Sequence, residues 1–183
     1  MEHKELKEQF KIRLSGVEDG NYCYSIKCNR EFFELAKIAD VEDGELDLRI
    51  EMEKSDRLAK LTFEFSGYVS APCDRCLLPV CIPMDFENRL IVKLVAEPEK
   101  SAAADDDDIW IIDENTYELD VFHFVYESIF LALPLRIVHE DDENGNPTCD
   151  PDILRKMEEL ENAAKSSKEN DPRWDALKKI ITD

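Results

Sequence analysis

The stretch that decides the fold reads Glu45-Leu46-Asp47-Leu48-Arg49-Ile50-Glu51-Met52-Glu53. Its apolar and charged residues alternate without a break, and every second side chain of a strand points to the same face of a sheet. The stretch therefore predicts a strand with one buried and one solvated face. Such strands are typical of an antiparallel sheet that is covered on one side.

The same alternation appears on both sides of this strand. Residues 61–65 follow it after a short polar connection, and residues 86–95 alternate less regularly. Upstream, residues 10–14 and 22–26 also alternate, and the Asp19-Gly20 pair between them favours a turn. We therefore predict an antiparallel sheet in which residues 10–14 and 22–26 form a hairpin.

The second half of the chain changes to helical patterns. Residues 109–112 are apolar and predict a short buried strand that returns to the sheet. Asp120 is a good N-cap for an amphipathic helix that Pro134 ends, and this helix is expected to cover the sheet. Asp150-Pro151 opens a second helix and Asp171-Pro172 a third. The predicted fold is α+β: an antiparallel β-sheet packed by helices, with a C-terminal helical tail.

Length and composition favour one domain. A chain of 183 residues with 43% apolar content can build one sizeable core but is short for two independent ones. We place a single α+β domain at residues 1–165 and a tail with a short C-terminal helix at residues 166–183. Residues 96–108 include four consecutive aspartates and predict a solvated acidic loop within the domain.

Charge and hydropathy indicate which classes of partner and which cellular compartment to expect. The net charge of -20 repels phosphate backbones, so direct RNA contact is expected to be limited, whereas basic proteins are suitable partners. Acidity that only maintains solubility is an equally good interpretation of the charge. No stretch approaches the roughly 20 consecutive apolar residues of a membrane span, and the first residues lack the pattern of a signal peptide. We expect an acidic cytoplasmic protein with no membrane contact.

Six cysteines are present, and a reducing compartment favours metal binding or redox chemistry over disulfides. Cys73 and Cys76 form a Cys-x-x-Cys pair between Pro72 and Pro79, which predicts a tight connection, or knuckle, between two strands. Two cysteines at this spacing can turn both sulfurs toward one tetrahedral ion. The pair is thus half of a candidate zinc site.

A structural zinc site takes about four protein ligands, so two more are needed. His139 and Cys149 lie on the polar loop after the long helix and would complete a Cys₃His set, although nine residues separate them. Cys149 also precedes the N-cap Asp150, where the positive end of a helix favours a thiolate. Cys81 is the rival ligand because it lies close to the pair in sequence.

Two other interpretations of the cysteine pair stay open. The thiols of Cys73 and Cys76 can be reduced and unligated, simply packing in a turn. They can also perform thiol exchange, but that use generally places the first cysteine at a helix start in a βαβ pattern, whereas antiparallel strands flank this pair. Cys23 and Cys28 are interpreted as ordinary small apolar residues.

No catalytic set is apparent elsewhere in the chain. His123 lies on the apolar-rich helix, where a structural histidine is commoner than a general base. Only five glycines are present, and none forms a phosphate-binding loop. We predict that the protein is not an enzyme. The alternative is a zinc- or thiol-dependent enzyme that acts through Cys73 and Cys76.

Three blocks of the sequence resemble motifs of one known family, and they occur in the same order as in that family. Residues 67–77 contain Cys73-Asp74-Arg75-Cys76-Leu77, which is similar to the Cys-x-Arg-Cys-Leu motif of the YceD family, the large ribosomal RNA subunit accumulation proteins. Residues 119–135 resemble the family's second block, and residues 171–179 resemble its C-terminal signature. The blocks fall in the family's order between residue 67 and residue 179.

The resemblance implies a bacterial ribosome-biogenesis factor that supports accumulation of large-subunit ribosomal RNA without catalysis. We expect it to act through protein contacts, with a ribosomal protein or a pre-ribosomal particle as partner. Many relatives carry further cysteines after the second block, which suggests a fuller metal centre, whereas this chain has only His139 and Cys149 there. The expected cofactor is a structural Zn²⁺ or none.

The resemblance and the local charge also suggest partner contacts. The candidate partner-binding residues are Arg75, Arg173, Trp174, Lys178 and Lys179. For the tail, however, we favour the interpretation that the cations only complement the negative end of the last helix.

Overall fold

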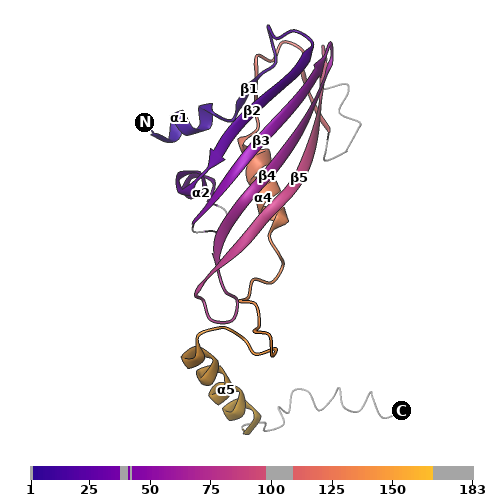
Figure 1. Ribbon diagram of the computed structural model, residues 1–183. Coiled ribbons are helices and arrows are strands. Elements are labelled where there is room, and N and C mark those ends of the chain that lie inside the picture. Colours follow the sequence, from indigo (N-terminus) through magenta and orange to yellow (C-terminus); the bar gives the residue numbers. More distant parts are fainter. Residues whose placement is uncertain (1, 38–40, 42, 98–108, 167–183) are drawn as a thin grey trace, which may run out of the picture. The chain divides into compact units, whose positions relative to one another are not determined.

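The computed structural model describes residues 2–37, 41, 43–97 and 109–166 (Figure 1). The chain divides into two compact units. The first, here called the sheet body, comprises residues 1–72 and 79–137, and the second, the knuckle unit, comprises residues 73–78 and 138–183. Most of the predicted acidic loop and the whole predicted helix after Asp171-Pro172 lie outside the described residues.

Four consecutive strands of the sheet body form an antiparallel meander (Figure 1). They are β2 (Gly20–Cys28), β3 (Asp43–Ser55), β4 (Leu58–Pro72) and β5 (Pro79–Val95). In β3 every second side chain is buried from one end of the strand to the other, so the strand predicted from its alternation is confirmed. The predicted strands at residues 61–65 and 86–95 are also confirmed, within longer strands.

The fifth strand changes the predicted topology. β6 (Ile109–Asp113) pairs with β5 in parallel, with Ile91 opposite Ile109, so the prediction of a wholly antiparallel sheet is wrong at this edge. A parallel neighbour needs a crossover of about a dozen residues or more, and residues 96–108 supply that length. β6 is half-buried along its whole length rather than buried, because it pairs on one side only.

The predicted N-terminal hairpin is wrong. β1 (Lys11–Arg13) pairs instead with β7 (Glu118–Asp120) in a separate two-stranded sheet, with Ile12 opposite Leu119. Residues 22–26 lie in β2, whose neighbour is β3. Alternation identifies the buried face of a strand, but the strand can bury that face beside any partner of suitable pattern.

Helices cover one face of the sheet and close the core. α2 (Arg30–Ala36) lies against β2 and β3, and α4 (Phe122–Ala132) lies against β5, while α1 (Glu2–Glu8) adds Leu6 to the core. The covering helix predicted before Pro134 is confirmed as α4. Phe124 packs on Phe63 of β4 with tilted rings whose centroids are 4.8 Å apart, and Ser128 accepts a hydrogen bond of 2.9 Å from Asn88 of β5. Asp120 lies one residue before the N-cap position, Val121, and accepts the N–H of Phe122 at 2.9 Å.

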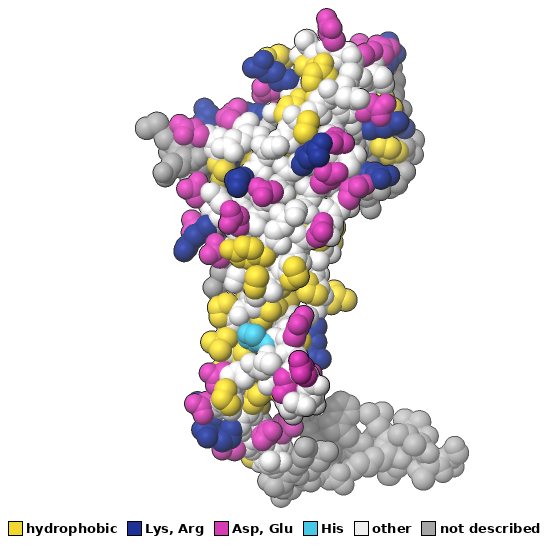
Figure 2. Space-filling model, viewed as in Figure 1, with side chains coloured by type: hydrophobic (Ala, Val, Ile, Leu, Met, Phe, Trp, Pro, Cys, Tyr) yellow, Lys and Arg dark blue, Asp and Glu magenta, His cyan; other side chains and the backbone are white. Residues whose placement is uncertain are grey.

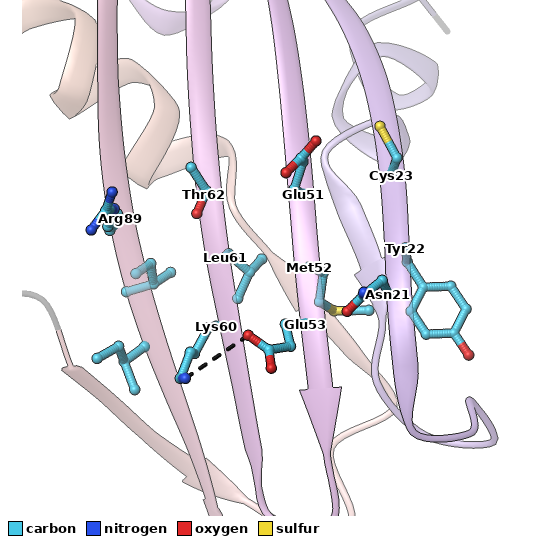
Figure 3. A pocket seen from close by; sticks show the side chains of 12 residues that line it. Asn21, Tyr22, Cys23, Glu51, Met52, Glu53, Lys60, Leu61, Thr62 and Arg89 are labelled. Atoms are coloured by element: carbon cyan, nitrogen blue, oxygen red, sulfur yellow. Dashed lines mark ion pairs between the residues drawn. The ribbon is translucent and has the colours of Figure 1, made fainter.

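The other face of the meander is polar and exposed. One row across it holds Cys23, Glu51, Thr62 and Arg89, which border a shallow hollow of about 780 Å³ (Figure 3). Cys23, which was interpreted as an ordinary small apolar residue, is exposed, and its sulfur accepts a hydrogen bond of 3.4 Å from Arg49. Acidic and basic side chains are also interspersed on the surface that Figure 2 shows.

One helix, α5 (Pro151–Ser166), belongs to the knuckle unit. The Asp150 carboxylate accepts the N–H groups of Asp152 at 2.8 Å and Ile153 at 3.3 Å, which confirms the predicted cap. Among the described residues, no helix combines the length and apolar character that a membrane crossing requires.

Candidate metal centre

The turn between β4 and β5 forms the predicted knuckle. Cys73 donates its N–H to the Leu78 carbonyl at 2.8 Å, and Leu77 donates its N–H to the Cys73 carbonyl at 2.9 Å. Leu77 has a φ of 62°, in the left-handed region that glycine adopts more readily. These contacts close the turn and leave both Cys73 and Cys76 buried.

A second turn brings His139 close to Cys149. The carboxylate of Asp142 accepts the N–H groups of Asn144 at 2.9 Å and Asn146 at 2.7 Å, and Gly145, with a φ of 80°, donates its N–H to the Asp142 carbonyl. The hydrogen bonds from Asn146 lower the pKa of Asp142 below its usual value. The chain thus reverses direction between His139 and Cys149. The two candidate ligands are therefore close in space although nine residues separate them in sequence.

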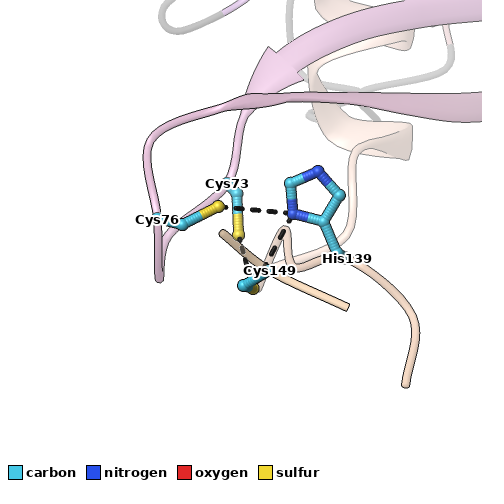
Figure 4. A group of neighbouring side chains, drawn as sticks. All are labelled: Cys73, Cys76, His139 and Cys149. Carbon is cyan, nitrogen blue, oxygen red and sulfur yellow. Dashed lines mark hydrogen bonds between the residues drawn. The ribbon is translucent and has the colours of Figure 1, made fainter. Parts of the chain in front are cut away.

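The four candidate ligands converge at one point of the knuckle unit (Figure 4). The His139 Nδ1 atom lies 3.4 Å from the Cys76 sulfur and 3.8 Å from the Cys149 sulfur, and the sulfurs of Cys73 and Cys149 are 3.8 Å apart. All four ligand atoms lie within 4.8 Å of one another. Cys73, Cys76, His139 and Cys149 therefore form a cluster that can hold a metal ion.

The dimensions of this cluster fit a tetrahedral zinc ion. Zn–S bonds of about 2.3 Å and Zn–N bonds of about 2.0–2.1 Å imply tetrahedron edges of about 3.8 Å between sulfurs and about 3.6 Å between sulfur and nitrogen. The three separations given above, 3.4–3.8 Å, agree with these edges, and the other three are no longer than 4.8 Å. A disulfide would bring two sulfurs to about 2.05 Å, so the cluster is not a bridge.

The surroundings shift the pKa values of Cys73 and Cys149 in opposite directions. Burial opposes ionisation of Cys73, but hydrogen bonds from the backbone N–H groups of Cys76, Arg75 and His139 outweigh it and lower the pKa of Cys73 to about 6. Burial and the neighbouring thiols of Cys73 and Cys76 raise the pKa of Cys149. The prediction that the helix end favours a thiolate at Cys149 is therefore wrong, because these neighbours outweigh it.

Arg75 lies against the sulfurs, which the sequence did not suggest. Its backbone N–H donates to the Cys73 sulfur at 3.4 Å, and its guanidinium Nη1 lies 3.7 Å from the Cys149 sulfur. The same Nη1 lies 3.7 Å from the Asp141 carboxylate, and the side chain is only 22% exposed. Arg75 thus places one positive charge beside a set of cysteine ligands.

The remaining cysteines lie outside the cluster. Cys81, the rival ligand, is exposed on β5 opposite Ser70. Cys28 is buried as expected, and burial together with the charge of Asp47 raises its pKa to about 12. The candidate partner residues of the tail lie outside the described residues; they are Arg173, Trp174, Lys178 and Lys179.

The interior of the knuckle unit has an unusual composition. Among its residues whose burial is described, 73–78 and 138–163, the buried ones are Cys73, Cys76 and Cys149. None of these three belongs to the apolar core, which lies in the sheet body. This described part of the unit has no apolar core of its own, and metal ligation is a usual substitute for one in small bodies.

Comparison with known proteins gives one match. The family model described as "Large ribosomal RNA subunit accumulation protein YceD" matches residues 61–181, a range that contains all four residues of the cluster. No curated protein and no solved structure gives a significant match.

Proposed function

The chain belongs to the YceD family of large ribosomal RNA subunit accumulation proteins, and we propose that it supports the accumulation of large-subunit ribosomal RNA in a bacterial cytoplasm. In this proposal it acts as a ribosome-biogenesis factor through contacts with a ribosomal protein or a pre-ribosomal particle. The net charge of -20 supports a basic protein as partner and opposes extensive contact with RNA phosphates.

The metal centre has a structural role in this proposal. Cys73, Cys76, His139 and Cys149 hold one Zn²⁺ ion that fixes the knuckle unit. The observation that carries this role is that, among residues 73–78 and 138–163, the buried side chains are those of three cysteines. Four protein ligands fill a tetrahedral shell, whereas catalytic zinc sites keep one position for water or substrate. The ligand set therefore supports a scaffold.

One observation favours the alternative, a thiol-dependent enzyme. The lowered pKa of Cys73, about 6, is typical of reactive cysteines. Against this stands the burial of the same sulfur, which faces Cys149 and the backbone of Arg75 and is closed off from solvent. Reactive cysteines need access to their substrate, so we propose ligation as the use of Cys73.

The biological role is tested by depletion. Lowering the amount of this protein in its host is expected to reduce large-subunit ribosomal RNA relative to small-subunit RNA, measured by quantitative electrophoresis of total RNA. Re-expression of the wild-type chain should restore the ratio. An unchanged ratio in depleted cells would contradict the proposed function.

The structural metal is tested on the purified full-length chain. Elemental analysis is expected to find zinc near one equivalent per chain, and Cys73→Ser should abolish it. Cys81→Ser is the matched control, since Cys81 lies outside the cluster. A Cys73→Ser chain that keeps its fold and its zinc but loses a thiol-exchange or hydrolytic activity would favour the enzyme.

A further inference from the structure

The tip of the knuckle exposes two leucines. Leu77 is 78% exposed and Leu78 is 44% exposed, directly after the second cysteine of the pair. Their backbones are held by the knuckle's own hydrogen bonds to Cys73, so the exposure is a property of a closed turn. Adjacent exposed apolar side chains on an ordered turn are typical of an interaction site.

The backbone of Leu77 makes the exposure more informative. Leu77 and Lys37 are the non-glycine residues with positive φ among the described residues. Lys37 ends α2 and donates its N–H to Phe33, and its side chain is polar and exposed, as suits a helix end. At position 77 a glycine would close the same turn without the steric cost of a Cβ atom. The turn requires the left-handed conformation but not a leucine, so the leucine side chain has a use of its own.

The candidate metal centre holds this tip in place. Both cysteines of the turn, which precede the leucines, are members of the cluster, so an ion bound there would fix the direction of the leucines. An anchor that is ordered before binding loses less conformational entropy when it binds a partner. The rigid turn and the exposed leucines are therefore both suited to binding a partner.

The charges near the tip indicate the kind of partner. Asp74 lies within the turn, and residues 140–143 read Glu-Asp-Asp-Glu on the loop that joins the knuckle through His139 and Cys149. Arg75 is the one lysine or arginine in segments 73–78 and 138–149, and its guanidinium faces Cys149 and Asp141. The surroundings of the tip are thus acidic, which attracts a basic protein surface and repels RNA phosphates.

We propose that Leu77 and Leu78 are the apolar anchors of a docking surface for a basic protein, which receives them in an apolar pocket bordered by lysine or arginine side chains. The inference rests on the proposed function and names the partner class that this function needs. A ribosomal protein satisfies this description because ribosomal proteins are a basic class of proteins.

The test compares two leucines of the knuckle unit that are about equally exposed. Full-length zinc-loaded chains carrying Leu77→Ala or Leu160→Ala are immobilised and incubated with RNA-free protein extracted from purified large ribosomal subunits. Leu160 lies on α5 and is 71% exposed. Leu77→Ala is expected to weaken retention of a basic subunit protein at least tenfold, as for a binding hot spot, and Leu160→Ala to leave it unchanged.

A second variant separates docking from folding. Leu77→Gly removes the anchor and relieves the backbone, so it should retain zinc and melt at the same or a higher temperature while binding as weakly as Leu77→Ala. Wild-type binding by either Leu77 variant would overturn the proposal. So would loss of zinc in Leu77→Gly, or a demonstration that Leu77 binds naked ribosomal RNA or a second copy of this chain.

Complementation distinguishes this inference from the proposed function. Depleted cells are supplied with the Leu77→Gly chain, and the ratio of large- to small-subunit RNA is measured. If depletion lowers the ratio and Leu77→Gly fails to restore it, the inference is supported. Full restoration by Leu77→Gly overturns the docking surface alone, whereas a ratio that depletion does not change removes the proposed function itself.

Discussion

The sheet body and the knuckle unit are stabilised in different ways. The sheet body buries a continuous apolar core that includes Phe10, Phe32 and Phe63, each with no measurable exposure. The described part of the knuckle unit buries three cysteines and exposes Leu77, Leu78 and Leu160, while its polar loop is held by the hydrogen bonds of Asp142. The hydrophobic effect stabilises the sheet body, whereas we propose that a metal bound by the cluster stabilises the knuckle unit together with local hydrogen bonds.

The two kinds of stabilisation place different demands on the surrounding side chains. An apolar core needs many residues in contact, so it suits an element that has only to be stable. A ligand cluster holds a few residues in a fixed geometry and leaves the adjacent side chains free to face outward. The stabilisation of the knuckle unit is thus compatible with an exposed apolar tip, which a hydrophobic core would have buried.

Removal of the metal should have the largest effect and should be confined to one unit. Structural zinc contributes apparent binding free energies of about 10–16 kcal/mol, far more than the few apolar contacts of the knuckle unit can supply. Chelation, or Cys76→Ser, is expected to open residues 138–166 to proteolysis and amide exchange while the sheet retains its circular dichroism signal. Melting of the sheet along with the knuckle unit would show that the two are not independently stabilised.

Truncation of the apolar core should have the converse effect. Phe63→Ala removes a fully buried ring that packs on Phe124, and such changes cost about 3–5 kcal/mol. Urea unfolding followed by the sheet signal should show this loss, with the zinc content unchanged. Thr62→Ala, one residue away on the exposed face, is the matched control and should change stability by no more than about 0.5 kcal/mol. Loss of zinc in Phe63→Ala would show that the centre depends on the apolar core.

Loss of the Arg75 side chain should weaken the metal centre without unfolding it. Three thiolates, a neutral histidine and Zn²⁺ leave one net negative charge, which the guanidinium beside Cys149 offsets. Residues that support metal ligands typically contribute about 10–100-fold in metal affinity, so Arg75→Ala should release zinc to a competing chelator faster by a factor in that range. Arg75→Lys should recover part of the loss. Arg155→Ala, which breaks a surface ion pair on α5, should have no effect.

Substitution of the exposed cysteines should have the smallest effect. Cys23 and Cys81 lie on the surface of the sheet body, outside the cluster. The double variant Cys23→Ser, Cys81→Ser is expected to keep the wild-type zinc content and a stability within about 0.5 kcal/mol of wild type. Elemental analysis and thermal melting check both values, and a fall in zinc would assign a ligand that the geometry does not include.

The strands of the sheet could be predicted because the alternation of apolar and polar residues is a local pattern in the sequence. In β3 the burial of each residue follows from its side-chain direction, and that direction alternates along the strand. Pairing is a different matter: β1 buries Ile12 in a strand pattern like that of β2, yet its neighbour is β7, more than one hundred residues away. Alternation carries no information on which strand lies beside which, or on the parallel direction of β6.

The ligand set could be predicted from chemistry, and its neighbours could not. Cys73 and Cys76 have a spacing with a geometric meaning, and His139 and Cys149 were the donors that the polar loop offered. The turn residues Asn144, Gly145 and Asn146 were the signal that the loop reverses between them. The role of Arg75 depends on the direction of its side chain, and that of Leu77 on its left-handed backbone. No residue pattern predicts this direction or this backbone conformation.

The pairing of β1 with β7 has a consequence for the order in which the protein is built. During synthesis, β2 to β5 follow one another along the chain and each can pair with the strand made just before it. Residues 11–13 must wait until residues 118–120 have been made, because their hydrogen-bonding partners do not exist earlier. β1 is therefore placed later than its position before β2 suggests, and Ile12 has no strand partner until residues 118–120 have been made.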